Sequence, residues 1–385
     1  MPQTLLTRRR SGPLVLAAAA LVATAIAPTA SAQTPLLSST ASVRTQATSP
    51  YAGTDPSTWS THRLAAQLVV SCVDMGHLDR AVRQAAAGVG AVVLLGHPPA
   101  HLAARLAAVG GAATTPVRPF VASDEEGGLV QRLRDVIYPL PSARTMGRWS
   151  TTRVRATAHD YATRMHRLGV LMDLAPDADL DVPGAYIDSL DRSFSADPDR
   201  VASHDRAWRL GMTPAGVVTV LKHWPGHGSA TNSHVGPARV APLATLQQND
   251  LVPFDRELAA GAPVVMVGHL LSKGLTSGGI PASESPRALH YLRREAGPDV
   301  VVMTDSLSMA AASSSIGRTP AQATVAALEA GADWAMACDS APLRAVTAVR
   351  RALDSGALPR AQADRSARRI LALKARAGLA PSTSG

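Results

Sequence analysis

Several side chains that can transfer protons, attack carbon or bind hydroxyl groups stand directly after short apolar runs of strand length. These residues are Asp124, Lys222, His223, His269 and Asp305. In a barrel of parallel strands, functional side chains collect at the carboxyl ends of the strands. A carboxylate in that position also serves often as a helix N-cap, and Asp305 before residues 306–309 fits that simpler role equally well. The argument for chemistry therefore depends on the shared position of these residues.

Residues 222–234, KHWPGHGSATNSH, form the most informative segment of the chain. The pair Pro225 and Gly226 stops regular structure directly after a strand-like run. The Gly-, Ser- and Asn-containing loop that follows ends in His234. Such a loop can carry an imidazole over a pocket. The alternative is a surface loop with incidental histidines, which three histidines in one short segment make less favourable.

A zinc site is the competing interpretation of the same segment. His223 and His227 have the i, i+4 spacing that brings two ligands together on a helix. Pro225 and Gly226 lie between them, so the two rings do not share a helix face. The chain also has no HExxH pattern. We therefore expect no metal and no other cofactor.

The elements that must position these side chains alternate along the chain. Eight short runs rich in Val and Leu occupy residues 67–72, 91–95, 119–122, 170–174, 217–221, 264–267, 300–303 and 333–338. Amphipathic stretches separate them, for example at residues 154–168, 198–210, 246–260, 286–296 and 343–355. Eight parallel strands close a barrel. An open doubly wound sheet would call for a Gly-rich dinucleotide fingerprint, which is missing. The pattern predicts an α/β fold, a single irregular (β/α)8 TIM-type barrel.

Composition supports this fold class and narrows the partners. Hydrophobic residues make up 46% of the 385 residues and aromatic residues only 3%, which suits parallel strands under Ala-rich helices better than a β-sandwich. The formal net charge is +9, and it falls to about +6 without Arg8, Arg9 and Arg10. A moderate positive charge favours contact with anionic polymers such as a cell wall. No basic run carries interleaved aromatic residues, so we expect no nucleic-acid partner.

Both ends of the chain look different from its centre. Residues 1–32 have a basic start, an apolar run over 13–27 and a small-residue site at 30–32, which predicts a secretory signal peptide. No Cys follows that run to carry a lipid. Residues 33–58 are predicted to be a flexible Ser-, Thr- and Pro-rich linker, 59–379 the catalytic barrel, and 380–385 a disordered tail. We expect a secreted monomer that has no membrane attachment after signal cleavage.

The two cysteines test the proposed barrel closure. Cys72 lies in the first strand-like run and Cys338 in the eighth, and these runs are neighbours in a closed barrel. We expect the two side chains to be close. A disulfide is one outcome in an exported protein, and two small buried thiols are the other.

Four segments of the chain resemble the signature of glycoside hydrolase family 3 enzymes of the β-N-acetylhexosaminidase type. The segments are KHWPGHG at 222–228 with Ser233-His234, DEEGGLVQR at 124–132, DRSF at 191–194 and TDSLSM at 304–309. The second is similar to the family pattern D-x-E-G-G-x-V-x-R. The matches follow the family's order and cover roughly residues 60–376.

The resemblance implies a retaining hydrolase that releases terminal β-linked N-acetylhexosamine, such as GlcNAc, from peptidoglycan fragments or chitooligosaccharides. Asp305 would be the nucleophile that forms a covalent glycosyl-enzyme. His234 would be the acid/base in place of the usual second carboxylate, since an imidazole can fill both roles near neutral pH. The residues implied to bind the sugar are Asp124, Arg132, Arg192, Lys222, His223 and His269.

One position departs from the family pattern. The family usually has Asp two residues before the loop histidine, whereas this chain has Asn232. Asn can orient His234 through a hydrogen bond but carries no charge, and Asp to Asn in the analogous role of a Ser-His-Asp triad costs roughly 10⁴ in turnover. We expect activity to be retained and Asn232→Asp to raise it.

Two other functions remain open. One is a β-glucosidase-like specificity, whose family members commonly carry a further domain with a Glu acid/base, for which this chain leaves no room. The other is a catalytically impaired protein that binds cell-wall glycan, which Asn232 motivates.

Overall fold

The structure is a computed structural model that describes residues 55–379 apart from Pro116 and Ser340. The predicted signal peptide, most of the predicted linker and the predicted tail lie outside these residues. The strands are β1 Val69–Asp74, β2 Ala91–Leu95, β3 Phe120–Ser123, β4 Glu125–Gly127, β5 Val130–Gln131, β6 Met172–Asp173, β7 Val218–Thr219, β8 Leu221–Trp224, β9 Ala238–Arg239, β10 Val264–Val267, β11 Leu270–Leu271, β12 Val301–Ser306 and β13 Trp334–Ala337. The α-helices are α1 Thr61–Gln67, α2 Leu78–Ala86, α3 Leu102–Gly111, α4 Ala143–Met146, α5 Thr151–Leu168, α6 Tyr186–Ser189, α7 Pro198–Met212, α8 Leu243–Leu246, α9 Leu251–Ala259, α10 Pro286–Ala296, α11 Pro320–Ala330, α12 Leu343–Ser355 and α13 Arg360–Arg376.

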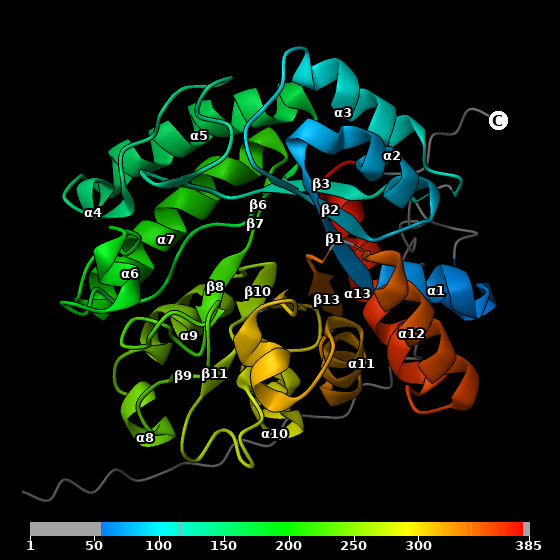
Figure 1. Cartoon of the computed structure of the whole chain (residues 1–385). Helices are drawn as coiled ribbons and strands as arrows, with labels where there is room; N and C mark the ends of the chain where they lie inside the picture. Colours follow the sequence, from blue (N-terminus) through cyan, green and yellow to red (C-terminus); the bar gives the residue numbers. More distant parts are fainter. Residues whose placement is uncertain (1–54, 116, 340, 380–385) are drawn as a thin grey trace, which may run out of the picture. The chain divides into compact units, whose positions relative to one another are not determined.

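The main sheet is a parallel barrel (Figure 1). Its order is β7-β6-β3-β2-β1-β13-β12-β10-β8, and every neighbouring pair is parallel. The two ends of this order, β7 and β8, are halves of one chain segment, because Val220 between them bonds instead to the carbonyls of Asp173 and Ala175. β7 pairs with β6 and β8 pairs with β10, so this split fifth strand closes the barrel. The predicted irregular (β/α)8 barrel is confirmed.

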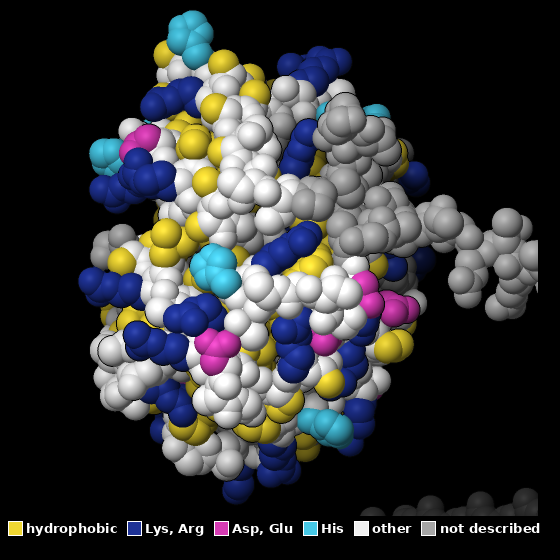
Figure 2. Space-filling view, turned by 90° about the vertical axis from the view of Figure 1, so that its right-hand side faces the viewer, with side chains coloured by type: hydrophobic (Ala, Val, Ile, Leu, Met, Phe, Trp, Pro, Cys, Tyr) yellow, Lys and Arg dark blue, Asp and Glu magenta, His cyan; other side chains and the backbone are white. Residues whose placement is uncertain are grey.

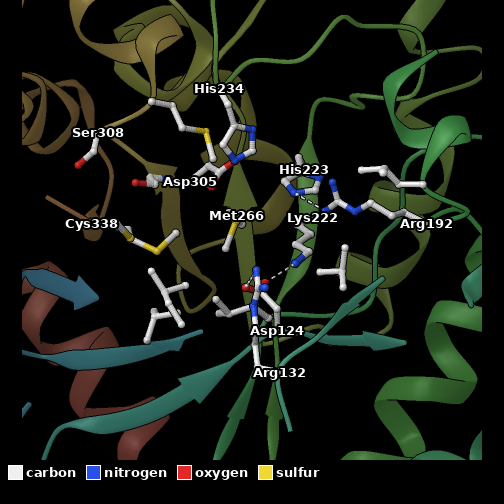
Figure 3. A pocket seen from close by; sticks show the side chains of 18 of the residues that line it. Asp124, Arg132, Arg192, Lys222, His223, His234, Met266, Asp305, Ser308 and Cys338 are labelled. Atoms are coloured by element: carbon white, nitrogen blue, oxygen red, sulfur yellow. Dashed lines mark hydrogen bonds and ion pairs between the residues drawn. The ribbon is translucent and has the colours of Figure 1, made fainter. Parts of the chain in front are cut away.

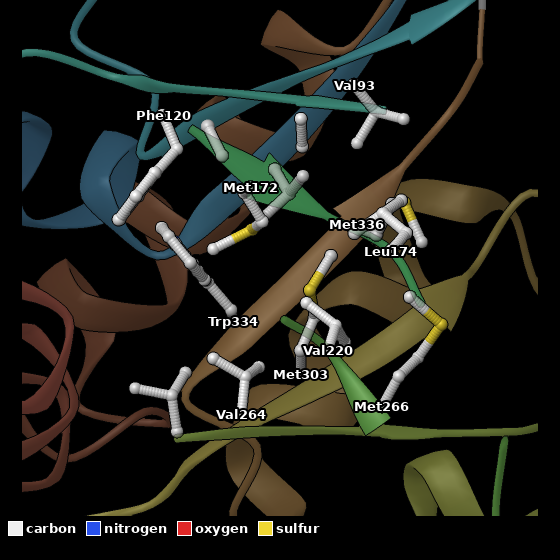
Figure 4. Packing of buried hydrophobic residues seen from close by; sticks show 14 of the residues in the cluster. Val93, Phe120, Met172, Leu174, Val220, Val264, Met266, Met303, Trp334 and Met336 are labelled. Carbon is white, nitrogen blue, oxygen red and sulfur yellow. The ribbon is translucent and has the colours of Figure 1, made fainter. Parts of the chain in front are cut away.

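The barrel interior is aliphatic and sulfur-rich, as the low aromatic content requires. Figure 4 shows methionine side chains from different strands packed against Val and Leu, with Phe120 and Trp334 together at one end. The rings of Phe120 and Trp334 meet edge to face with centroids 6.0 Å apart. The Trp334 indole N–H donates to the carbonyl of Gln67 at 2.7 Å, so burial leaves no polar group of that ring unpaired.

The helices follow the predicted ranges with one break. α10 and α12 have the predicted bounds, while α5 starts three residues before the predicted 154 because Ser150 caps its first turn. The predicted helix over 246–260 is wrong as one element: α8 ends at Leu246 and α9 begins at Leu251. Pro253 has no backbone N–H to donate into a longer helix and is tolerated only in a first turn, which favours the restart.

The start of the described chain is attached to the last helix. Pro56–Thr58, within the predicted linker, form a short 3₁₀ helix, and the Arg360 guanidinium donates to the carbonyls of Pro56 and Trp59 at 2.8 and 2.7 Å. Among the described residues, no helix combines the length and apolarity needed to cross a bilayer.

Cys72 and Cys338 form a disulfide across 266 residues of sequence. Cys72 lies in β1 and Cys338 directly follows β13, and these two strands pair in the barrel. The predicted proximity is therefore confirmed, and the bond links the first and last strands of the barrel.

Candidate active site

A cavity of about 440 Å³ opens at the carboxyl ends of the barrel strands (Figure 3). Seven of the predicted site residues line it: Asp124, Arg132, Arg192, Lys222, His223, His234 and Asp305. The structure thus brings together residues that are spread along the sequence from position 124 to position 305. Asn232 and His269, the other two predicted residues, are not among the lining side chains.

Asp305 is the second-last residue of strand β12, and the residue is 9% exposed. The backbone N–H of Ser306 donates to its Oδ1 at 2.7 Å. Burial alone would raise the pKa of Asp305, but His223, His269, the Ser306 N–H and His234 outweigh it and hold the pKa below its ordinary value. The carboxylate is therefore ionised at neutral pH, and it lines the cavity. Both properties are required of a carboxylate nucleophile.

His269 is buried next to the end of β12 and does not line the cavity. Its Nδ1 is 2.8 Å from the Ser283 hydroxyl, and its Nε2 is 2.8 Å from the carbonyl of Ser306. Burial holds the pKa of His269 below its ordinary value. Both ring nitrogens are engaged within the protein, so the ring holds the end of β12 in place.

His234 reaches the cavity from the loop after β8. The loop is attached beside β12, because the N–H groups of Ala310 and Ala311 donate to the carbonyls of His234 and Ser233 at 3.3 Å each. His234 itself is exposed at the cavity mouth. In Figure 3 its ring lies above Asp305. The fifth and seventh strands therefore present an imidazole and a carboxylate to the same hollow.

Asn232 orients His234. Its Oδ1 lies 3.0 Å from the backbone N of His234 and 2.9 Å from the ring Nδ1. The amide of Asn232 carries no charge, so it forms a hydrogen bond but no ion pair with the His234 ring.

The cavity wall opposite Asp305 is an ion-pair network centred on Glu126. Lys222 Nζ lies 2.5 Å from Glu126 Oε1 and 2.8 Å from Asp124 Oδ1. Arg192 contacts both oxygens of Glu126 at 2.8 Å and Asp177 at 3.2 Å. Burial would raise the pKa of Glu126, but the two cations lower it to about 2. The carboxylates of the network keep Lys222 and Arg192 charged although both are buried. Both side chains carry several N–H groups, so each can also donate to a ligand.

His223 joins this network through Asp179. Its Nδ1 lies 2.7 Å from Asp179 Oδ2, and its Nε2 lies 3.3 Å from Arg192. Burial lowers the pKa of His223 below its ordinary value, although Asp177 opposes this effect. A neutral ring that donates from Nδ1 to Asp179 presents Nε2 as an acceptor toward the cavity side.

Asp177, Asp179 and His223 each offer one atom within 4.8 Å of the others, the spacing of a metal site. Arg192 Nη2 stands 3.2 Å from Asp177 and 3.3 Å from His223, so a fixed cation already neutralises this cluster. His227 is not part of this group: its backbone N–H donates to Asp179 at 2.6 Å, and its ring Nε2 lies 3.3 Å from the Ser233 hydroxyl. The donor set does not fit a second cation.

Arg132 is the least constrained of the cationic residues. Its Nη2 is 3.9 Å from Asp124, and its Nε has no hydrogen-bond partner among the described residues. The backbone N–H of Arg132 donates to the Asp124 carbonyl at 3.2 Å, which fixes the start of the side chain. The guanidinium is positioned to bind a ligand.

Sequence reasoning did not single out three residues of this site. Glu126 was inside the DEEGG segment, and Asp179 follows the fourth strand-like run, so both carried a positional signal. Tyr186, at the start of α6, lines the cavity with its ring centroid 6.3 Å from that of His234. No periodicity or motif marked Tyr186, because a short helix in a long connection brings it there.

Comparison with known proteins agrees with this geometry. The sequence model of the glycosyl hydrolase family 3 N terminal domain matches residues 67–373. The beta-hexosaminidase LpqI of Mycobacterium tuberculosis is 41% identical over 271 residues, which cover 67% of this chain and 69% of LpqI. A beta-hexosaminidase of Stenotrophomonas maltophilia is 36% identical over 59% of this chain and 69% of its own length.

Solved structures are similar as well. A glycosyl hydrolase family 3 member from Mycobacterium smegmatis superposes with a TM-score of 0.75 at 34% identity, covering 83% of this chain and 98% of that one. A beta-N-acetylhexosaminidase from Beutenbergia cavernae gives a TM-score of 0.76 at 29% identity over 82% of this chain and 99% of its own. Because the family model covers residues 67–373 and these solved structures have the same fold, the chain belongs to glycoside hydrolase family 3.

Proposed function

We propose that this protein is a retaining β-N-acetylhexosaminidase that removes terminal β-linked GlcNAc. The observation that carries the proposal is the pairing of Asp305 and His234 in one cavity of about 440 Å³. The hexosaminidase names of the relatives support the sugar, since similar barrels of similar sequence carry that activity. A hollow of this size can hold one terminal sugar residue.

Two displacement steps account for the chemistry. In the first, one carboxylate oxygen of Asp305 attacks the anomeric carbon while protonated His234 donates its Nε2 proton to the departing glycosidic oxygen. The C–O bond to the aglycone breaks and a glycosyl ester of Asp305 forms. In the second, neutral His234 takes a proton from water, the water oxygen attacks the anomeric carbon, and the ester bond breaks. Two inversions give overall retention.

Asp305 is prepared for this role by its surroundings. The Ser306 N–H holds Oδ1, which leaves Oδ2 for attack. Neighbouring histidines hold its pKa below the ordinary value, so no proton has to leave before the attack. His269 keeps the Ser306 carbonyl in place, and we assign it a positioning role in β12 rather than a contact with the sugar.

The opposite wall supplies sugar recognition. Lys222 and Arg192 donate from fixed positions, Asp124 accepts, and the Nε of Arg132 has no hydrogen-bond partner within residues 55–379 as the structure describes them. Charge-assisted hydrogen bonds to hydroxyl groups are roughly twice as strong as neutral ones. The Nε2 of His223 can accept a hydrogen bond, and Arg192 lies 3.3 Å from this nitrogen. These groups are the binding site we propose for the ring hydroxyls and the N-acetyl group.

For the natural substrate we propose peptidoglycan fragments or chitooligosaccharides outside the cell. The motive is the basic start, apolar run and small-residue site of residues 1–32, which together form a secretory signal pattern. The positive net charge is compatible with an anionic cell wall.

The test is a panel of aryl glycosides with purified protein. We expect turnover of aryl β-N-acetylglucosaminide and far slower turnover of aryl β-glucoside. Asp305→Ala should lower the first rate by at least about 10⁴, as removal of a catalytic nucleophile does. Added azide should then restore turnover and yield the α-glycosyl azide, because azide attacks once from the face that Asp305 vacated.

Asn232 favours one second candidate, a glycan-binding protein with impaired catalysis. This second candidate predicts that the wild-type chain binds chitooligosaccharides and turns over neither aryl glycoside. Preference for the glucoside would instead support the β-glucosidase-like alternative. Equal activity of wild type and Asp305→Ala would end the proposed mechanism.

A further inference from the structure

A second hollow, of about 830 Å³, lies on the outer surface between α2, α11 and α12. We name it the arginine groove. The residues that line it are Arg80, Arg83, Gln84, Ala321, Ala341, Pro342, Leu343, Arg344, Thr347, Ala348 and Arg351. Four are arginines, and the lining contains no acidic and no aromatic residue. Figure 2 looks onto the side of the molecule where α2 and α12 lie in Figure 1, and Lys and Arg side chains, in dark blue, are spread over that face.

Most of this positive charge is not neutralised. Arg83 contacts Asp79 at 2.8 Å on the exposed surface of α2. Arg80, Arg344 and Arg351 form no ion pair with any acidic residue in the described part of the chain, and all three are exposed. Cations facing each other across a groove repel one another unless an anion lies between them.

The backbone adds to the positive potential. α2 and α12 begin after β1 and β13, so their N-termini point to the same end of the barrel as the catalytic cavity. Neither helix has a side-chain hydrogen bond at its N-cap, His77 in α2 and Pro342 in α12. Helix N-termini carry partial positive charge from unpaired N–H groups, and anions are stabilised there.

The groove is adjacent to the catalytic cavity along the chain. Cys338 lines the cavity, and Ala341, Pro342 and Leu343 line the groove. Both hollows therefore include residues from the segment that follows the carboxyl end of β13.

We propose that the arginine groove binds a linear polyanion that bears phosphate or carboxylate groups at successive repeats. Guanidinium groups match both oxyanions through paired hydrogen bonds. The groove is too large for one such anion, and four arginines on two helices suit a chain of them. Because no aromatic side chain lines it, the groove has no surface on which bases can stack, which disfavours single-stranded nucleic acid. The proposal does not depend on the hexosaminidase activity.

The test uses fluorescently labelled polyphosphate as the phosphate probe and labelled polyglutamate as the carboxylate probe, with the full chain at low salt. The triple variant R80Q/R344Q/R351Q should weaken the binding of whichever polymer the wild type binds by at least about tenfold. The matched control is R155Q/R167Q/R206Q, which removes the same charge from exposed positions of α5 and α7. It should stay within about twofold of wild type.

Three results would overturn the proposal: no binding of either polymer by the wild type, equal weakening by both triple variants, or tighter binding of a single-stranded DNA of equal charge. Binding of polyphosphate alone or of polyglutamate alone identifies the anion that the groove prefers. Turnover of the aryl glycoside by R80Q/R344Q/R351Q should equal that of wild type, which shows that the variant is folded and that the groove is distinct from the catalytic cavity.

Discussion

Asn232 Oδ1 accepts two hydrogen bonds from the same residue, one from the backbone N–H of His234 at 3.0 Å and one from its ring Nδ1 at 2.9 Å. The backbone group can only donate, so the atom that it faces must be the amide oxygen and not the amide nitrogen. The same oxygen then requires a proton on Nδ1. Asn232 therefore fixes the tautomer in which Nε2 carries the lone pair when the ring is neutral and the transferable proton when it is charged.

This geometry defines what Asn232 lacks. It orients the ring as an Asp would, but it gives the imidazolium no charge stabilisation. We expect Asn232→Asp to raise kcat for aryl β-N-acetylglucosaminide about tenfold and to move the basic limb of the pH–rate profile upward, since a carboxylate favours the charged ring. Asn232→Ala, which removes the orienting oxygen, should lower kcat. A lower kcat in Asn232→Asp would show that Asn is the adapted residue.

The acid limb of the same profile should report Asp305. Its pKa is held below the ordinary value of 3.8, so the nucleophile stays ionised, and activity should fall only below about pH 4. His269 is one of the groups that lower this pKa. His269→Gln keeps a hydrogen-bonding side chain but cannot be protonated, so the acid limb should move upward.

Ser283→Ala is the control for that substitution. It removes the hydroxyl at Nδ1 of His269 but leaves the titratable ring in place. The acid limb should then stay near the wild-type position. If the acid limb of the pH–rate profile does not move in His269→Gln, the histidine only holds β12 in place and its charge does not affect Asp305.

Local sequence predicted the parts of this site that depend on local pattern. Strand-like runs and their following polar residues placed Asp305 and Lys222 correctly at one end of a barrel, because alternation of buried strands and amphipathic helices encodes that arrangement. The split of the fifth strand was not predictable, since it depends on carbonyls of Asp173 and Ala175 that compete for the Val220 N–H. Neither was the engaged ring of His269, whose partner Ser306 is 37 residues away.

The residue pairs that form hydrogen bonds and ion pairs in the polar wall of the cavity could not be predicted from the sequence either. His223 and Asp179 are 44 residues apart, and Arg192 and Glu126 are 66 apart. A motif shows that such residues occur but not which charges meet. The distinction matters for the adjacent acids Glu125 and Glu126, which look equivalent in sequence and differ completely in structure.

Glu126→Gln should destabilise the fold through that difference. It leaves Lys222 and Arg192 buried without their shared carboxylate, which typically costs about 3–5 kcal/mol. The pKa of Glu126 is lowered from 4.5 to about 2, so its contribution is fully present above pH 4.5 and is lost as the pH falls through 2. Urea unfolding at a series of pH values should therefore show the gap between variant and wild type shrinking over that interval.

Glu125→Gln is the matched control at the next residue. Burial raises the pKa of Glu125 to about 8, although hydrogen bonds from Ser123 and Tyr161 oppose this, so the group is largely protonated at pH 7. A neutral amide resembles the protonated acid, and we expect a loss of about 1 kcal/mol or less. Equal losses at both positions would contradict the assignment of the charge to Glu126.

Tyr186 should act on the aglycone. Among the described residues that line the cavity, it alone has a phenol or indole ring, and it lies beside His234, the proposed acid/base. A group beside the proton donor faces the departing sugar, and an aromatic ring contributes about 1 kcal/mol against an apolar face. Tyr186→Ala should lower kcat/KM for the GlcNAc disaccharide about tenfold and for methyl β-N-acetylglucosaminide less than twofold, with Tyr186→Phe near wild type. Equal losses for both substrates, with a displaced basic limb, would show that the ring acts on His234 instead.

The Cys72–Cys338 disulfide should couple stability to substrate binding. It closes a loop of 266 residues between the first and last strands of the barrel, and removing a disulfide commonly costs about 2–4 kcal/mol. C72S/C338S should therefore lower Tm by about 3–6 °C for a domain of this size. Because Cys338 lines the cavity, KM should rise more than kcat falls. A reducing agent should reproduce both effects in wild type and change neither quantity in the double variant, since a chain without thiols has nothing to reduce. A reductant effect of equal size in the double variant would assign the change to the reagent rather than to the bond that closes the barrel.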